Sequence, residues 1–181
     1  KSALAATNEV EAADYWRSVF GEDFPLAKVE SQENLELGDT SHIQNASEMG
    51  WTEALQENIR ISISCKQRSS KSSKLISYHG GSSVLTTSRS LKFEASIEPR
   101  NLLNTGAKVW WRITNTGEIA HSFGSLRGNF ILARGEGGGT SPNELINWER
   151  TSYKGVHLVE AFLVRNSLVI AKSEVFKVNI R

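Results

Sequence analysis

The eight residues Ile-Arg-Ile-Ser-Ile-Ser-Cys-Lys at 59–66 alternate strictly between apolar and polar side chains. The same period of two recurs at 91–98, at 108–114 and at 176–181. Such alternation places the apolar side chains on one face, which is typical of antiparallel strands that cover a core from one side. Because turns rich in Asn, Gly and Ser separate these stretches, we expect a mainly β protein, an immunoglobulin-like antiparallel β-sandwich.

Other stretches fill in the expected sandwich. Residues 157–164 are denser in apolar side chains and predict a central strand, followed by a turn at 166–167 and a strand at 168–171. The Ser- and Lys-rich segment 68–90 predicts a long loop that holds a short strand. The Gly-rich segment 135–143 predicts a flexible loop at a strand end.

A different pattern precedes the strands. Residues 8–20 predict a short helix with Trp16 and Phe20 on one face, and a helix of this length needs a docking partner to be stable. We therefore divide the chain into a helical or irregular acidic segment, 1–58, and a β-sandwich domain, 59–181.

Charge is divided in the same way. The chain has 181 residues and a net charge of +1. Residues 1–58 carry twelve acidic and three basic residues, whereas 59–181 carry eight acidic and eighteen basic residues. The basic part is therefore expected to attract either the acidic part or an external anion, unless its charges only solvate the surface.

Composition also bears on location. No apolar run approaches the roughly 18 residues of a membrane span, and no signal-peptide pattern opens the chain, so we expect a cytoplasmic protein. The single cysteine, Cys65, excludes an intramolecular disulfide and continues the apolar face of its strand, which predicts a packed thiol. Because the chain begins at Lys1, we expect it to be a piece of a longer protein.

The residues of several catalytic centres are missing. The aspartates are limited to Asp14, Asp23 and Asp39 without a D-x-D pair, although two-metal chemistry needs clustered carboxylates. The sequence His-Gly-Gly at 79–81 lacks the G-x-S-x-G motif of a hydrolase. The four histidines lack metal-ligand spacing. We expect no catalytic activity, metal or cofactor in this chain.

Some side chains instead suit recognition. Trp110 lies between Lys108 and Arg112 at a spacing of two, so it either stacks a base beside two cations or packs under the amino-terminal segment. Tyr153 precedes the central strand and is expected to form a tyrosine corner, with its hydroxyl bonded to the main chain. His157, at the start of that strand, is open to either a structural or a binding role.

Arg127 is the other candidate for anion binding. It precedes Gly128, which lets a ligand approach the backbone, and a guanidinium group binds phosphate in a bidentate manner. The alternative is a structural salt bridge from Arg127 to Glu149 or Glu118. The sequence leaves these two roles open.

Four motifs occur in order in the second half of the chain: V-W-W-R-I-T-N-T-G-E-I-A at 109–120, L-R-G at 126–128, W-E-R-T-S-Y-K-G-V-H-L-V-E-A-F at 148–162 and F-K-V-N-I at 176–180. This series resembles the adenylyl/guanylyl and SMODS carboxy-terminal sensor domain. The matching residues are Trp111, Asn115, Gly117, Ala120, Leu126, Arg127, Gly128, Glu149, Thr151, Tyr153, Gly155, His157, Val159 and Glu160. Segments 68–90 and 135–143 depart from the pattern.

A further stretch, A-A-D-Y-W-R-S-V-F-G-E-D-F-P at 12–25, is similar to the segment that follows the catalytic core in many cGAS/DncV-like nucleotidyltransferases. The resemblance implies that residues 1–58 adjoin a catalytic nucleotidyltransferase domain of a longer bacterial protein, and that 59–181 regulate it. Enzymes of this kind make nucleotide second messengers in anti-phage defence. The resemblance therefore implies a non-catalytic domain that senses a nucleotide, an oligonucleotide or a phage-derived cue, with a homo-oligomer as a further expectation.

In this hypothesis Arg127, Arg112 and His157 contact the anion, Trp110 or Trp111 stacks on it, and Tyr153 and Asn115 hold the loops. The full set of expected ligand-site residues is Arg127, Arg112, His157, Trp110, Trp111, Tyr153, Asn115 and Glu149. The rival hypothesis is a purely structural or oligomerising sandwich that packs on the catalytic domain without a ligand. A third class, a sugar-binding or adhesive sandwich, predicts secretion, and the free cysteine and absent signal peptide speak against it.

Overall fold

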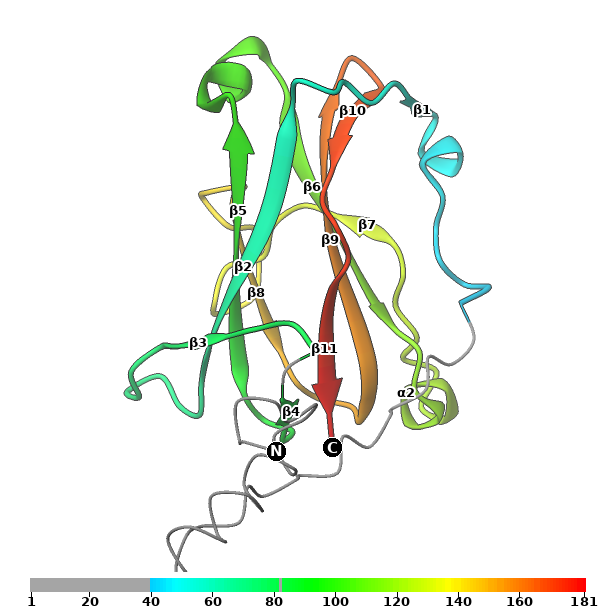
Figure 1. Cartoon of the computed structure of the whole chain (residues 1–181). Helices are drawn as coiled ribbons and strands as arrows, with labels where there is room; N and C mark the ends of the chain where they lie inside the picture. Colours follow the sequence, from blue (N-terminus) through cyan, green and yellow to red (C-terminus); the bar gives the residue numbers. More distant parts are fainter. Residues whose placement is uncertain (1–39, 82) are drawn as a thin grey trace, which may run out of the picture. The chain divides into compact units, whose positions relative to one another are not determined.

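The computed structural model describes residues 40–81 and 83–181, which form two β-sheets packed face to face (Figure 1). Most strand pairs are antiparallel, so the prediction of a mainly β, antiparallel sandwich is confirmed. The predicted helix at 8–20 lies outside the described residues.

One sheet, here called sheet B, consists of four antiparallel strands. In spatial order they are β3 (Ile76–Tyr78), β2 (Arg60–Arg68), β5 (Ser90–Glu98) and β8 (Ile146–Arg150). The alternation seen in the sequence is realised here, because Leu91 and Phe93 are buried between the sheets whereas Ser90 and Lys92 are only partly buried. One face of sheet B is therefore core and the other is polar.

The second sheet, sheet A, is built around the long strand β9 (Gly155–Arg165). One edge of β9 pairs with β6 (Lys108–Asn115), which pairs in turn with β7 (Phe130–Ile131). The other edge pairs with β10 (Leu168–Lys172) and then β11 (Phe176–Ile180), and these pair in parallel with β1 (Thr52–Glu53) and β4 (Val84–Leu85) respectively. The predicted central strand is thus confirmed.

The turn between β9 and β10 also follows the prediction. Asn166 and Ser167 have φ angles of 50° and 61°. A two-residue hairpin turn with both φ angles positive matches the twist of the flanking strands, and asparagine tolerates this conformation well. Segment 68–90 contains two short strands, β3 and β4, where one was expected.

Among residues 40–81 and 83–181, three short helical segments complete the fold. They are η2 (Ala46–Met49), η3 (Arg100–Thr105) and α2 (Glu118–Ser122). Helix α2 follows directly on β6 and lies at one end of the sandwich (Figure 1). The sequence does not predict this helix, because five residues are too few to show a helical period.

The core between the sheets includes fully buried Trp111, Phe93 and Leu163. Cys65 is buried in the same core, and burial raises the pKa of its thiol to about 12. The predicted packed thiol is therefore confirmed.

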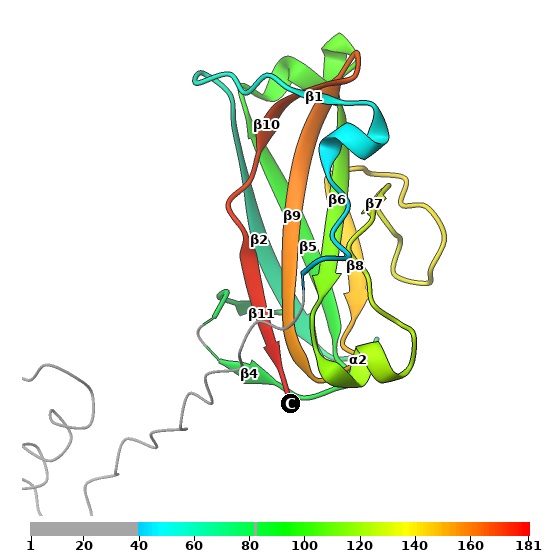
Figure 2. The ribbon, with the colours of Figure 1, turned by 90° about the vertical axis from the view of Figure 1, so that its right-hand side faces the viewer.

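A smaller apolar cluster covers the opposite, outer face of sheet A, where η2 and the residues after it lie along β6 and β9 (Figure 2). Trp51 meets Trp110 and Phe130 edge-on, with ring centroids 5.1 and 4.9 Å apart. Residues 46–53, which the sequence analysis placed in the amino-terminal segment, thus pack on the sandwich.

Candidate functional site

A polar cluster closes the end of the core where β6 ends. The Asn115 side chain accepts a hydrogen bond from the Arg127 backbone N–H (2.6 Å) and donates one to the Ser125 carbonyl (2.9 Å). Asn115 is buried, so these two bonds satisfy its amide and fix both ends of the strand-to-loop connection that contains α2. The backbone of Arg127 is thereby held in place.

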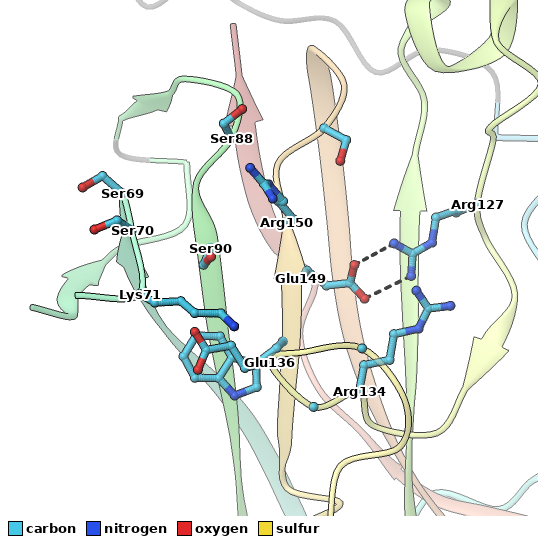
Figure 3. A pocket seen from close by; sticks show the side chains of 14 residues that line it. Ser69, Ser70, Lys71, Ser88, Ser90, Arg127, Arg134, Glu136, Glu149 and Arg150 are labelled. Carbon is cyan, nitrogen blue, oxygen red and sulfur yellow. Dashed lines mark hydrogen bonds and ion pairs between the residues drawn. The ribbon is translucent and has the colours of Figure 1, made fainter. Parts of the chain in front are cut away.

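The Arg127 side chain joins the two sheets. The Arg127 guanidinium group donates to both carboxylate oxygens of Glu149 on β8, at 2.7 and 3.0 Å (Figure 3). The Arg127 side chain is 33% exposed and that of Glu149 11%. A bidentate pair of this kind is strong and directional, so the structural salt bridge that the sequence left open is the one observed.

His157 lies at the same end of the sandwich, directly opposite Asn115 in the β6–β9 register. Its Nε2 is 3.0 Å from the Tyr153 carbonyl oxygen and donates to it. The pKa of His157 is lowered to about 4, chiefly by burial and also by the nearby Arg127 charge, although the Tyr153 hydrogen bond and Glu149 act to raise it. His157 is therefore neutral at pH 7, and its expected contact with the anion stays a prediction.

Beside the Arg127–Glu149 pair lies a pocket of about 540 Å³. It extends from the end of β2 across β5 and β8 to the Gly-rich loop after residue 134 (Figure 3). Five serines line it together with four basic and two acidic side chains. The basic residues are Lys71, Arg127, Arg134 and Arg150, and the acidic ones are Glu136 and Glu149. The pocket is thus polar and carries a positive excess.

Three of these cations have no carboxylate partner in the part of the chain that the structure describes. Within the described residues, no ion pair is formed by Lys71, Arg134 or Arg150, and all three are exposed. The backbone of Arg134 is fixed by Asn147 and Trp148, so its side chain projects from a defined point (Figure 3). An anion entering the pocket would meet these three cations first.

An aromatic ring adjoins the cations. Trp148 lines the pocket from β8, and the Arg68 guanidinium lies over its ring at 5.1 Å from the centroid. Arg68 also pairs with Glu136 of the Gly-rich loop. An indole beside basic groups suits a ligand that combines a planar ring with phosphates.

Arg112, in contrast, lies away from this pocket on the outer face of sheet A. Its guanidinium donates to Glu160 at 2.9 and 2.7 Å and to the Gln44 carbonyl at 2.8 Å. It also stacks over Phe130 and Phe162. The guanidinium group is thus engaged in hydrogen bonds and ring contacts away from the pocket, so the expectation that Arg112 contacts the ligand is corrected to a structural ion pair.

The two tryptophans on β6 also lie outside the ligand site in which they were expected. Trp110 packs against Trp51, so the alternative in which it lies under the amino-terminal segment is the one observed. Trp111 is 0% exposed, and its Nε1 donates to the Glu144 carbonyl at 2.9 Å. A ring with no exposed surface has no face to offer a ligand.

The expected tyrosine corner is wrong for Tyr153. Its hydroxyl donates to the Ser125 side chain at 3.0 Å instead of the main chain, which ties the turn between β8 and β9 to the loop before Arg127. The main-chain bond is made by Tyr78, whose hydroxyl donates to the Ser83 carbonyl at 2.9 Å. Both tyrosines hold loops, but only Tyr78 does so through the backbone.

A comparison with protein-family models matches residues 39–181 to the adenylyl/guanylyl and SMODS C-terminal sensor domain. The match covers far more than half of the chain. The chain belongs to this family. The resemblance stated from the motifs is thereby confirmed. A search of curated proteins finds no match.

The sensor-domain motifs meet at the end of the sandwich described above. Gly117 packs closely against the backbone of Lys154 and Gly155. A Cβ atom at Gly117 would lie only 2.4 Å from the Lys154 carbonyl oxygen. Gly128 of the L-R-G motif is in contact with the backbone of Ile43, where a Cβ would approach to 3.0 Å. That glycine thus admits the chain's own segment, which corrects the expectation that it admits a ligand.

The sensor domain's unpaired cations are the residues that sequence reasoning missed. Trp148 and Arg150 are two apart on β8 and share its outer face, which is the same signal that drew attention to Trp110. Lys71 and Arg134 lie in loops whose approach to β8 no local pattern encodes. In the described part of the chain no group of His, Cys, Asp and Glu could hold a metal ion, and no helix has the length and apolar character of a membrane span.

Proposed function

We propose that this sensor domain binds a nucleotide or nucleic acid in the pocket beside β8 and so regulates an attached nucleotidyltransferase. In this proposal the domain has no catalytic activity, and the parent protein makes a second messenger for anti-phage defence in the bacterial cytoplasm. The observation that carries the proposal is the convergence of Lys71, Arg134 and Arg150 on one pocket, where none of them pairs with a carboxylate of residues 40–81 or 83–181.

The chemistry of the pocket favours a phosphorylated ligand. Guanidinium groups bind phosphate oxygens in a bidentate manner, and the serine hydroxyls that line the walls donate further hydrogen bonds. The pocket volume of about 540 Å³ is within the range of small-ligand sites. Trp148 adds a planar surface for a base.

Regulation then requires a coupling between the pocket and the catalytic domain. A ligand shifts an equilibrium only by its differential affinity for two states. The Arg127–Glu149 pair borders the pocket and ties β8 to the loop that contains α2. Binding beside this pair would favour one arrangement of α2 over another, and α2 presents exposed Ile119 and Phe123 to a neighbouring domain.

Isothermal titration calorimetry of the 181-residue chain at low salt tests the proposal. The titrants are ATP and a short oligothymidylate, and the variants are Arg134→Ala and Arg150→Ala. Each variant should weaken binding between about 10-fold and about 150-fold, because a charge-assisted hydrogen bond contributes about 1.5–3 kcal/mol. Lys177→Ala, an exposed cation on β11 of sheet A, is the matched control and should bind normally. No heat with either titrant would refute the proposal.

A structural role is the second candidate, and specific contacts favour it for part of the matched motif. Arg127 and Arg112 both direct their charge to buried or half-buried carboxylates, Glu149 and Glu160. If the whole domain were structural, Arg127→Ala would lower its stability and no ligand would bind the wild-type chain. The same titration therefore separates the two candidates.

A further inference from the structure

The outer face of sheet B carries a group of cations that continues beyond the pocket. The β2–β5–β8 register places Lys66, Lys92 and Trp148 side by side in one row across the sheet. The next row contains Arg68, Ser90 and Arg150. Neighbouring strands lie about 5 Å apart, so the four cations form one continuous patch. We call Lys66, Arg68, Lys92 and Arg150 the basic face.

The basic face is only partly neutralised by the protein. Lys66 and Lys92 share the single carboxylate of Glu94, and the contact with Lys92 lowers the pKa of that carboxyl group. Arg68 pairs with Glu136, and Arg150 has no ion pair among the described residues. Four positive charges thus meet two negative ones. Like charges held this close repel one another, and a polyanion would remove that cost.

The positions of these cations distinguish between ligands. Arg150 lines the pocket, but Lys66 and Lys92 lie outside it on β2 and β5. A mononucleotide held in the pocket would leave Lys66 and Lys92 without phosphate contacts. A chain of phosphates that leaves the pocket at Arg150 and crosses the sheet would reach both.

Trp148 favours a single strand over a duplex. It lies in the same row as Lys92 and is only partly buried. The Arg68 guanidinium lies over its ring at 5.1 Å, so a base would stack there by displacing this group. Stacking on an aromatic side chain requires an unpaired base, because the bases of a duplex already stack on one another. We propose that the basic face binds single-stranded nucleic acid, with the backbone crossing β8, β5 and β2 and a base on Trp148.

This inference rests on the proposed function and deepens it, so the experiment must separate the two. Fluorescence anisotropy of the 181-residue chain is measured with labelled oligothymidylates of about 3 and about 12 nucleotides, with ATP as competitor. The longer strand should bind at least tenfold more tightly, and a duplex of the same length should bind more weakly. Equal affinity for both lengths, or tighter binding of the duplex, would overturn the inference while leaving the proposed function standing.

Variants locate the strand on the face. Lys66→Ala and Lys92→Ala should each lower the affinity for the longer oligonucleotide several-fold. Each should also reduce the slope of log affinity against log salt concentration by about 0.7, because one phosphate contact is lost. The affinity for ATP should stay unchanged. Trp148→Leu should cost between about 5-fold and 100-fold, the effect of one lost base stack. Lys177→Ala on sheet A is again the control. Wild-type affinity in both lysine variants would refute this path, and failure of every probe to bind would refute the proposed function itself.

Discussion

Replacement of Arg127 by methionine separates the structural residues of this domain from its binding residues. The substitution removes both hydrogen bonds to Glu149 but keeps the aliphatic bulk of the side chain and the backbone bonds to Asn115. Loss of one partner of a buried ion pair costs about 3–5 kcal/mol, whereas an exposed pair contributes about 0–1 kcal/mol. Because the Arg127 side chain is 33% exposed and that of Glu149 11%, we expect an intermediate loss of about 2 kcal/mol.

Thermal and urea denaturation of the 181-residue chain measure this loss. For a domain of this size, about 2 kcal/mol lowers the Tm by about 4–8 °C. Arg134→Met is the matched control, since Arg134 lines the same pocket but, among the described residues, bonds to its neighbours only through its backbone. It should change stability by less than about 0.5 kcal/mol.

A double-mutant cycle with Glu149→Gln identifies the cause. If the pair accounts for the loss, the double variant should be less destabilised than the sum of the two single variants by about 1–2 kcal/mol. Additive effects, or equal losses in Arg127→Met and Arg134→Met, would refute the assignment of Arg127 to the structure of the domain.

Three further predictions follow from buried groups. The Cys65 thiol, whose pKa burial raises to about 12, should react with a maleimide only after unfolding, and rapid labelling of the native chain would contradict its packing. The pKa of His157 is about 4 in the folded state, below its unfolded value of about 6.5. The unfolded state therefore binds more protons than the folded state. Because of this difference, the free energy of unfolding should fall by about 2 kcal/mol as the pH is lowered from about 7 to about 5. Urea denaturation should show that His157→Gln flattens this decrease, and an unchanged pH profile would contradict the burial. Glu160→Leu alone should lower the free energy of unfolding by about 3–5 kcal/mol, because it leaves the Arg112 charge buried without its partner. Adding Arg112→Met should restore most of this stability, because the apolar side chain then packs against the aromatic rings of Phe130 and Phe162. A double variant that stays as unstable as Glu160→Leu would contradict the structural role of the pair.

The fold was largely predictable because its signal is local. Strands such as β2 and β5 have one face in the core, so each shows its apolar period in its own sequence. The turn at Asn166 and Ser167 was predictable for the same reason, since its conformation depends on two residues. Helix α2 was not, because its five residues are placed by Asn115 and by contacts beyond it.

The site was less predictable, because it depends on which face of a strand is covered. Trp110 and Trp148 have the same local pattern, an aromatic residue with a cation two positions away. Residues 46–51 cover the face of β6 that carries Trp110, and the alternation of residues in β6 does not predict that this face is covered. The pocket cations Lys71 and Arg134 reach β8 from loops, so their convergence depends on tertiary structure alone.

The most direct test of the account is a crystal structure of the chain with a bound oligothymidylate. We predict phosphate oxygens within hydrogen-bond distance of the Arg134 or Arg150 guanidinium group, a base stacked on Trp148, and the Arg127–Glu149 pair intact beside them. Two results would contradict the account. In one, the strand binds on the outer face of sheet A. In the other, the strand breaks the Arg127–Glu149 pair and leaves Arg134 and Arg150 exposed to solvent.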